Sequence, residues 1–297
     1  MKISLIITLQ DDGDVFSNLI NYIKKLDTKP DEIIFVDSST KIEFSELIKK
    51  EILNLNIKHT YTKINKSYQG KALNHGIELS NYEYIALLDS KTFPIENWLT
   101  EYKKNMKKNN VDIVWGSTIF KKNTFFQQIY RCATYGKIIH KTLPGSLINK
   151  NIFKNKKYYF NENIRSSFDI EWKDIIKENH LSLMPNKFFI IYGSLPKNIL
   201  NALKKHTLYA FYTSLGKSEI NIKEIYVSIF LILSAIILPK WNFIISGWNN
   251  NPLYIPNVTK IYLICLIIIF LFYLILKKIK ILQIIMKSQN YKKILQY

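Results

Sequence analysis

The first hundred residues alternate short apolar runs with longer stretches whose apolar residues recur at helical spacing. The short runs are rich in β-branched and aromatic residues and predict buried strands at residues 3–9, 32–36, 58–63 and 84–88. The longer stretches predict helices at residues 15–26, 43–53 and 71–79. This alternation is typical of an α/β domain that has a mostly parallel, Rossmann-like sheet with helices on both faces.

The pattern continues with a predicted helix at residues 98–108 and a predicted strand at 111–120. The next section is less regular. Pro144 and Gly145 predict a turn, and residues 169–178 predict a helix. After Pro185 the pattern becomes a mixture of loop and helix. We therefore expect the α/β domain to cover residues 1–215.

Two uncharged apolar segments follow, at residues 225–238 and 261–276. At about 1.5 Å per residue they are roughly 21 and 24 Å long, so each needs flanking residues to cross a hydrocarbon core of about 30 Å. We predict transmembrane helices at about 222–241 and 258–277, which would form a hairpin within a membrane region at residues 216–297. A buried or interfacial helix is the alternative for the first segment.

Lysines flank this pair of segments on the outer sides, at Lys217 and Lys223 before it and at Lys277 and Lys278 after it. Fewer lysines lie between the segments. Because basic residues favour the cytoplasmic side of a membrane, we expect the α/β domain and the basic C-terminal tail on that side. Membrane lipids are therefore expected partners.

The chain carries 42 basic against 23 acidic side chains, and almost all of the basic ones are lysines. This excess favours phosphate-rich partners or an anionic membrane surface, although biased genome composition explains it equally well. We expect no nucleic-acid partner, because arginine clusters interleaved with aromatic residues are missing. Cys132 and Cys265 predict neither a disulfide framework nor a cysteine-rich metal site. The first residues enter a strand directly, so no signal peptide is expected.

Polar residues stand at the ends of the predicted strands. Thr8 and Asp11 follow the first strand, Asp37 the second and Asp89 the fourth. Ligands of open α/β sheets bind in the crevice beyond the carboxyl ends of the strands, where loops converge. We therefore expect these side chains to share one binding site.

Four segments in a fixed order resemble the inverting family 2 glycosyltransferases of the GT-A fold. They are the strand at 4–7, Ile-Ile-Phe-Val-Asp-Ser-Ser-Thr at 33–40, Gly-Lys-Ala-Leu-Asn-His-Gly-Ile at 70–77 and Tyr-Ile-Ala-Leu-Leu-Asp at 84–89. The resemblance extends over about residues 3–180. It implies an enzyme that transfers a sugar from a nucleotide-diphosphate sugar, by default a UDP-sugar, to a hydroxyl acceptor.

The resemblance makes Asp37 the uracil contact, with Thr8 and Asp11 in the same pocket. Thr8 stands where the family usually has proline, and Asp37 could instead cap the turn into the next helix. Lys71 and Asn74 lie one turn apart at the start of a helix, where an ammonium and the helix dipole favour a diphosphate. A solvated surface lysine is the alternative for Lys71.

Asp89 begins the family's Asp-x-Asp motif, which normally holds a divalent cation, but the third position is Lys91. One carboxylate together with substrate phosphates and water is able to hold Mg²⁺ or Mn²⁺, so Asp89 is the predicted metal ligand. Alternatively, the ammonium of Lys91 supplies part of that positive charge or points to solvent. The sequence leaves metal dependence open.

Residues 160–162 and 168–171 resemble the family's acceptor loop and its Glu-Asp pair, with Phe168 in place of the Glu. The resemblance makes Asp169 the general base, which takes the acceptor hydroxyl proton during an inverting displacement. Glu171 is the reserve, and an ordinary acidic residue at a helix N-terminus is the alternative. No Gln-x-x-Arg-Trp segment follows Asp169, which favours transfer of a single sugar over polymerisation.

The leading hypothesis is thus a membrane-attached glycosyltransferase that acts on a lipid-linked or cell-surface glycan. Lys91 and Phe168 leave open a catalytically impaired relative that binds nucleotide sugar or docks a partner. A nucleotidyltransferase ranks lower, because the acidic loop at residues 10–14 would repel a triphosphate.

Overall fold

The structure is a computed structural model that describes residues 1–11, 13–213, 222–245 and 253–271. The chain divides into two compact units, Met1–Lys217 and Ser218–Tyr297. The first unit holds the α/β fold and every predicted site residue. The predicted basic tail lies outside the described residues.

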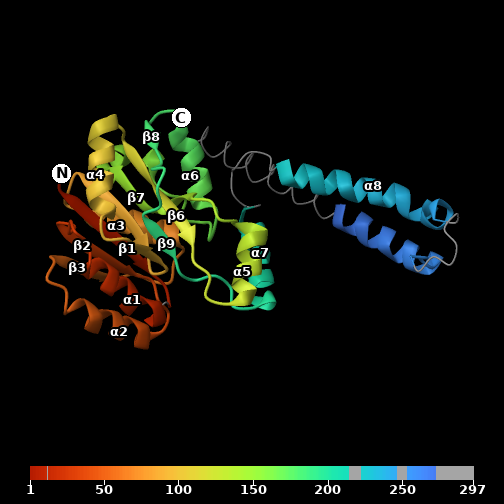
Figure 1. Ribbon diagram of the computed structural model, residues 1–297, viewed down its shortest axis with the longest axis horizontal. Coiled ribbons are helices and arrows are strands. Elements are labelled where there is room, and N and C mark those ends of the chain that lie inside the picture. Colours follow the sequence, from red (N-terminus) through yellow and green to blue (C-terminus); the bar gives the residue numbers. More distant parts are fainter. Residues whose placement is uncertain (12, 214–221, 246–252, 272–297) are drawn as a thin grey trace, which may run out of the picture. The chain divides into compact units, whose positions relative to one another are not determined.

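Four parallel strands form the first half of the sheet in the order β3-β2-β1-β4 (Figure 1). Their bounds are β1 Ile3–Leu9, β2 Glu32–Asp37, β3 His59–Lys63 and β4 Tyr84–Asp89. The four predicted strands are confirmed to within one residue. In the register, Thr8 of β1 pairs with Asp89 of β4, and Leu9 pairs with Asp37 of β2. The carboxyl ends of these three strands therefore meet at one edge.

The second half of the sheet runs in both directions. It contains β5 Thr92–Pro94, β6 Ile113–Phe120, β7 His140–Asn149, β8 Ser182–Leu183 and β9 Ile190–Tyr192. Strand β7 is antiparallel to both β4 and β6. Pro144 and Gly145, which predicted a turn, lie inside β7, where the β6–β7 register shifts between Val114 and Gly116 as at a bulge. Five of the eight strand pairings among the described residues are parallel, so the sheet is mostly parallel, as predicted, and β5 and β7 are antiparallel to their neighbours.

Helices cover both faces of the sheet, as predicted. Side chains of α1 Gly13–Lys24, α2 Ile42–Ile52 and α4 Trp98–Asn109 join one core cluster, and those of α3 Gln69–Leu79 and α6 Phe168–Lys177 join the other. Strand residues divide between the clusters by alternation: Leu5 and Ile7 of β1 belong to the first cluster, whereas Ile6 belongs to the second. A strand buried on both faces explains why β1 is apolar over most of its length.

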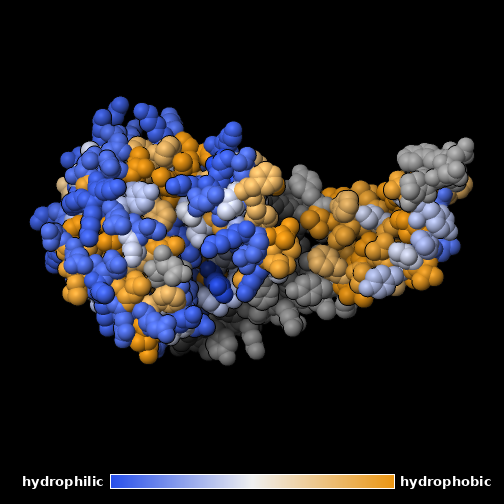
Figure 2. All heavy atoms as spheres, turned by 60° about the horizontal axis from the view of Figure 1, so that its bottom comes forward, coloured by the Kyte–Doolittle hydropathy of each residue, from blue (hydrophilic) through white to orange (hydrophobic). Residues whose placement is uncertain are grey.

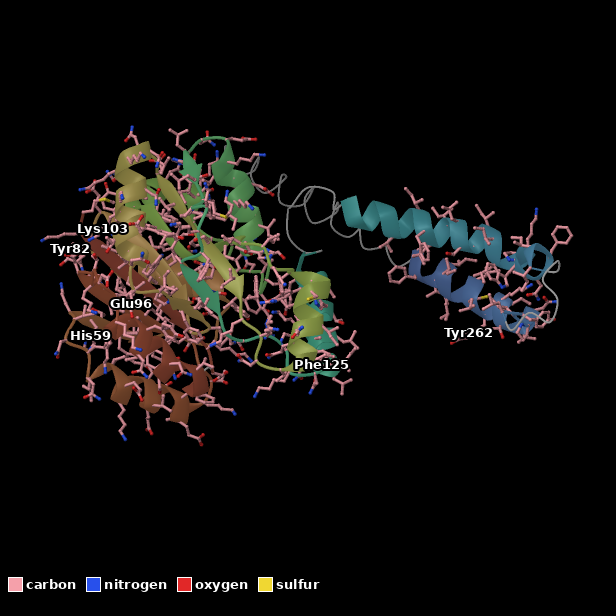
Figure 3. The ribbon with its side chains drawn as sticks, in the orientation of Figure 1. His59, Tyr82, Glu96, Lys103, Phe125 and Tyr262 are labelled. Carbon is pink, nitrogen blue, oxygen red and sulfur yellow. The ribbon has the colours of Figure 1, made fainter. Side chains whose placement is uncertain are left out.

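Two helices that the sequence pattern did not define pack beside the sheet, α5 Phe125–Thr134 and α7 Ile199–Thr213. Tyr130 of α5 and His206 of α7 share a hydrogen bond of 2.9 Å, and Tyr130 also packs in a small core with Ala202. Phe125 projects from α5 and is 78% exposed (Figure 3). Short 3₁₀ helices at Lys150–Lys154 and Lys156–Tyr158 lead toward α6.

The second unit contains α8, Ile222–Ile244, and a helix over residues 257–271. Apolar side chains cover much of its surface (Figure 2), and the side chain of Asn242 bonds both backbone groups of Ile255. The prediction of transmembrane helices at 222–241 and 258–277 is not supported, because no helix among the described residues is long and apolar enough to span a bilayer. Charges at Glu224 and Lys240 limit the uncharged part of α8 to about 22 Å. Residues 272–277 lie outside the described part.

Candidate active site

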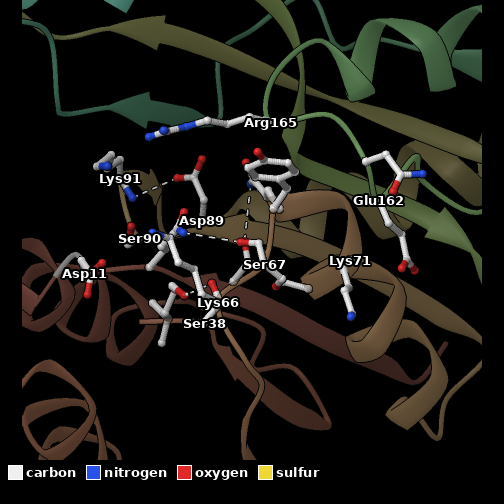
Figure 4. Close-up of a pocket in the computed structure, with 17 residues that line it drawn as sticks. Asp11, Ser38, Lys66, Ser67, Lys71, Asp89, Ser90, Lys91, Glu162 and Arg165 are labelled. Atoms are coloured by element: carbon white, nitrogen blue, oxygen red, sulfur yellow. Dashed lines mark hydrogen bonds between the residues drawn. The ribbon is translucent and has the colours of Figure 1, made fainter. Parts of the chain in front are cut away.

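A cavity of about 780 Å³ opens at the edge where β1, β2 and β4 end (Figure 4). Its walls come from the loop after β1, the residue after β2, the stretch 66–72, the loop after β4 and the loop at 162–165. The structure brings together five of the predicted site residues in this lining: Thr8, Asp11, Lys71, Asp89 and Lys91. We call it the donor cavity.

The loop after β4 holds Asp89 in a fixed orientation. The Lys91 backbone N–H donates to Asp89 Oδ1 at 2.9 Å, and the Thr92 hydroxyl bonds both the N–H and the carbonyl of Asp89 at 3.1 and 3.0 Å. Figure 4 shows the carboxylate of Asp89 between the side chains of Lys91 and Arg165. A carboxylate thus enters the cavity with cationic groups around it.

The surroundings of Asp89 do not fit a divalent cation well. Among the described residues, no group of three His, Cys, Asp or Glu side chains is placed to hold a metal ion. Lys205 of α7 also faces this region: burial and then the charge of Lys91 lower its pKa to about 8, while Asp89 opposes that shift. One carboxylate among several cationic side chains is better suited to an anionic ligand than to a metal.

Asp11 lines the donor cavity, but its carboxylate is already engaged with the loop after β2. Its Oδ1 accepts from the N–H groups of Thr40 at 2.9 Å and Lys41 at 3.2 Å, and its own N–H donates to Ser39 Oγ at 2.9 Å. Burial alone would raise the pKa of Asp11, yet these hydrogen bonds hold it below its ordinary value. Asp11 has a φ of +50°, so it shapes the loop that borders the cavity.

Asp37, the predicted uracil contact, is not among the described residues that line the cavity. It is completely buried, and its carboxylate accepts hydrogen bonds from Ser39 N–H at 2.8 Å, Ser45 Oγ at 2.6 Å and Tyr61 OH at 2.7 Å. Lys63 lies 3.5 Å away as an ion-pair partner. The sequence could not reveal this, because a carboxylate at a strand end looks the same whether it points outward or inward. Ser38, its neighbour, lines the cavity instead.

Asn74 also lies outside the cavity lining, where a diphosphate contact was predicted. It is buried, and its amide group donates to the Phe160 carbonyl and to Glu162 Oε1, both at 2.9 Å. Its oxygen accepts from the Phe160 N–H at 2.9 Å. Gly70 permits this contact between α3 and the loop, because a Cβ there would collide with the Asn161 carbonyl. Asn74 is therefore a positioning residue for the loop that carries Glu162 and Arg165.

Positive side chains stand near the start of α3. Lys71 projects there as predicted, and Lys66 joins it from the preceding loop (Figure 4). The pattern of the sequence did not single out Lys66, because the chain has so many lysines that spacing alone does not separate a cavity lysine from a surface one. The ammonium groups and the helix N-terminus both favour a bound anion.

Asp169 lies in the first turn of α6, after Ser167 with a φ of +69°. It is not among the described residues that line the donor cavity, but burial raises its pKa, which makes it a stronger base. Tyr209 of α7 lies within electrostatic reach of both Asp169 and Asp89, because burial and then the charges of these two carboxylates raise the Tyr209 pKa. Glu171, the reserve, instead accepts a hydrogen bond from Asn161 at 2.9 Å.

Trp115 of β6 belongs to the core. It is 2% exposed and packs edge-on against Trp172 at 5.6 Å between ring centres. Its neighbour Gly116 is needed for packing, since a Cβ there would collide with the Pro144 carbonyl.

Similar solved structures share this fold at low sequence identity. S. aureus TarS residues 1–349 in complex with UDP-GlcNAc superpose with a TM-score of 0.52 at 15% identity, covering 90% of this chain and 72% of that one. The mannosyltransferase PcManGT from Pyrobaculum calidifontis in complex with GDP-Man and Mn²⁺ gives a TM-score of 0.54 at 14% identity, covering 74% and 66%. The chain spans 44% of the longer TarS chain. These likenesses establish a GT-A-like fold.

No curated protein sequence matches the chain significantly. The sequence profile described as Glycosyl transferase family 2 matches residues 4–170, more than half of the chain. That match contains the donor cavity's strands and ends at the first turn of α6. The chain therefore belongs to glycosyl transferase family 2 and is a glycosyltransferase.

Proposed function

We propose that this glycosyltransferase moves a single sugar, with inversion, from a nucleotide-diphosphate sugar to a hydroxyl of a lipid-linked or cell-surface glycan. A UDP-sugar is the default donor. The observation that carries the proposal is the convergence of Thr8, Lys71, Asp89, Lys91 and Arg165 on one cavity at the carboxyl edge of the sheet. That edge is where ligands of open α/β sheets bind.

The donor cavity suits a nucleotide sugar in size and charge. Its volume of about 780 Å³ is within the range of small-molecule sites. Lys71 and Arg165 offer charge-assisted hydrogen bonds to a diphosphate. TarS is in complex with UDP-GlcNAc and PcManGT with GDP-Man, so similar folds hold donors of this class.

In the proposed reaction, the acceptor oxygen attacks the anomeric carbon from the face opposite the diphosphate. The new glycosidic bond forms as the bond from the anomeric carbon to the phosphate oxygen breaks, and the nucleoside diphosphate leaves. Asp169 takes the proton of the acceptor hydroxyl, a role that its raised pKa favours. The sugar is inverted in this one displacement.

The negative charge that develops on the leaving diphosphate needs a positive partner. We propose that Lys91 supplies part of it, because Lys91 lines the donor cavity beside Asp89 where the family motif has a second Asp. Arg165, which lines the same cavity and is drawn above Asp89 in Figure 4, is placed to assist. Both act from protein side chains, so this part of the proposal requires no metal ion.

We place the enzyme at the cytoplasmic face of a membrane. This placement is supported by exposed apolar side chains of the second unit: Phe230, Ile236 and Val258 are 69%, 63% and 80% exposed. Exposed apolar side chains on helices favour contact with lipid or another protein. Sedimentation of the full chain with vesicles tests this: we expect it to pellet with them, and recovery of all protein in the supernatant would contradict the placement.

Purified full-length protein should be incubated with a panel of nucleotide-diphosphate sugars and membrane extract, and the products analysed by mass. We expect release of one nucleoside diphosphate and addition of one sugar to an extract component. Binding of the donor without release or transfer would favour the catalytically impaired relative instead. If no donor bound to the protein and none released a nucleoside diphosphate, the proposal would be overturned.

A further inference from the structure

A second cavity, of about 640 Å³, lies next to the donor cavity. Its lining combines residues 192–197 and α7 with residues that also line the donor cavity. Those shared residues are Gln10, Tyr68, Gln69, Lys91 and Arg165. The two cavities therefore adjoin at Lys91 and Arg165, and a molecule in the second cavity would lie next to the donor.

The second cavity is strongly positive. Its cationic lining residues are Lys91, Arg165, Lys197, Lys204 and Lys205. None of the described residues that line it is an aspartate or glutamate. The whole chain has 42 basic and 23 acidic side chains, so a cavity lined at random by five basic residues would also include acidic ones. The lining of the second cavity departs from that composition. The donor cavity, by comparison, includes Asp11, Asp89 and Glu162.

Aromatic rings hold one of these cations in place. The ammonium of Lys205 lies 5.4 Å from the ring centres of both Tyr192 and Tyr209 and 6.0 Å from that of Tyr135. Such contacts orient a cation and remove water from it. Burial and the nearby Lys91 lower the Lys205 pKa to about 8, so a bound anion would relieve an unfavourable cluster of like charges.

Tyrosines also give the cavity faces on which sugar or polyol carbons can pack. The hydroxyls of Tyr68 and Tyr212 lie 3.3 Å apart, and their rings are edge-on at 5.8 Å. Tyr209, 44% exposed, is the residue whose pKa responds to both Asp89 and the proposed base Asp169. The second cavity thus lies next to the donor cavity, and Tyr209 in its wall is within electrostatic reach of the proposed base.

We propose that the second cavity binds the acceptor through phosphate groups, so that the acceptor is a phosphate-bearing glycan or polyol chain. This inference rests on the proposed function and specifies its substrate class. Lys197 and Lys204, both exposed, bind phosphates at the outer part of the cavity. Lys205 and Arg165 bind the phosphate nearest to the donor, where Arg165 is suited to a two-point contact.

The test measures binding of defined probes to the purified full chain by calorimetry in low salt. The probes are a synthetic glycerol phosphate oligomer, a polygalacturonate oligomer, an uncharged glucan oligomer and a polyprenyl phosphate in detergent micelles. The variant Lys197→Gln/Lys204→Gln removes two charges from the cavity. Lys107→Gln/Lys108→Gln, on exposed positions of α4, removes two charges elsewhere and is the matched control.

We expect the glycerol phosphate oligomer to bind and its Kd to rise about tenfold in the cavity variant but not in the control. Tighter binding of polyprenyl phosphate, with the same loss in the variant, would place the phosphate on a lipid and also support the proposal. Preference for the galacturonate or glucan, or an equal change in both variants, would overturn it. Donor binding by the unmodified protein, measured alongside, reports separately on the proposed function.

Discussion

Asn74 of α3 and Phe160, 86 residues later, are joined by two hydrogen bonds. The Asn74 amide donates to the Phe160 carbonyl at 2.9 Å and its oxygen accepts from the Phe160 N–H at 2.9 Å. A primary amide both donates and accepts, so it matches both groups of one backbone residue, which an ionised Asp cannot do. The pair anchors the loop that brings Glu162 and Arg165 to the donor cavity. A side chain that the motif suggested as a phosphate ligand therefore acts by holding the site together.

Asn74→Ala should destabilise the protein by about 1–3 kcal/mol, because it leaves the buried N–H and carbonyl of Phe160 without these partners. It should also raise the donor KM, since Arg165 loses its anchored loop. Urea unfolding and initial-rate kinetics measure the two effects. Asn109→Ala is the control: this side chain makes an exposed hydrogen bond to Asn105, and its loss should change stability by less than about 0.5 kcal/mol. Equal changes in both variants would contradict the anchoring role.

Asp37→Asn tests whether this carboxylate is structural. Burial alone would raise the Asp37 pKa, but hydrogen bonds from Ser39, Ser45 and Tyr61 hold it below the ordinary 3.8. A lowered carboxylate pKa stabilises the fold above the ordinary pKa, and that stability is lost as the pH falls through the lowered value. The variant should therefore be less stable at neutral pH and lose less stability on acidification below about pH 4. Denaturant unfolding at several pH values measures both.

Tyr61→Phe removes one of these hydrogen bonds without removing the charge, and should cost about 1–2 kcal/mol. If Asp37→Asn instead left stability unchanged and abolished UDP binding, the Asp37 carboxylate would be a base contact, as predicted from the sequence, and not a structural group.

Chelation tests the role of Lys91. If ammonium groups rather than a metal neutralise the leaving diphosphate, EDTA should leave turnover unchanged, and Lys91→Ala should reduce it by roughly a hundredfold. Lys91→Asp restores the second carboxylate of the motif and should make the residual activity depend on added Mn²⁺. Complete loss of wild-type activity in EDTA, with recovery on adding Mn²⁺, would contradict this role.

Lys205 should give acceptor binding a pH dependence. Burial and Lys91 lower its pKa to about 8, so its charge is lost as the pH rises through that value. Affinity for a phosphate-bearing acceptor should therefore fall between about pH 7 and 9 in the wild type. Lys205→Arg should keep its charge and flatten the profile over this range, because arginine stays protonated.

The stability of the fold should change with pH in the opposite direction to acceptor affinity. Between about pH 8 and the ordinary lysine value of 10.5, the unfolded chain binds more protons at Lys205 than the folded one, so stability should rise with pH in that window.

A Lys205→Arg profile of acceptor affinity that fell as steeply as that of the wild type would show that another group controls acceptor binding.

The strands and helices of the first hundred residues could be predicted because each has a strong periodic pattern and is buried. Strand β7 could not, since Pro144 and Gly145 indicate a turn, and only tertiary pairing with β4 and β6 makes a strand of that segment. Helix α7 has a weak apolar face, so its role as a wall of the second cavity was not visible.

The site was predicted in part. Thr8, Lys71 and Asp89 reach the cavity because their positions follow directly from where strands end and helices begin. Sequence order does not reveal the direction of a side chain, so Asp37 and Asn74 were placed in the cavity although both are buried. Lys205 comes from a helix far along the chain, and only the folded structure brings it to Asp89.

Asp169 is the base of an inverting sugar transfer in the proposed mechanism. The initial rate of transfer by Asp169→Asn tests this role, with donor affinity measured on the same preparation. The amide keeps the shape of the side chain but cannot accept a proton. We predict a fall in the transfer rate of about a hundredfold or more with donor affinity unchanged. A transfer rate equal to that of the wild type would contradict the claim.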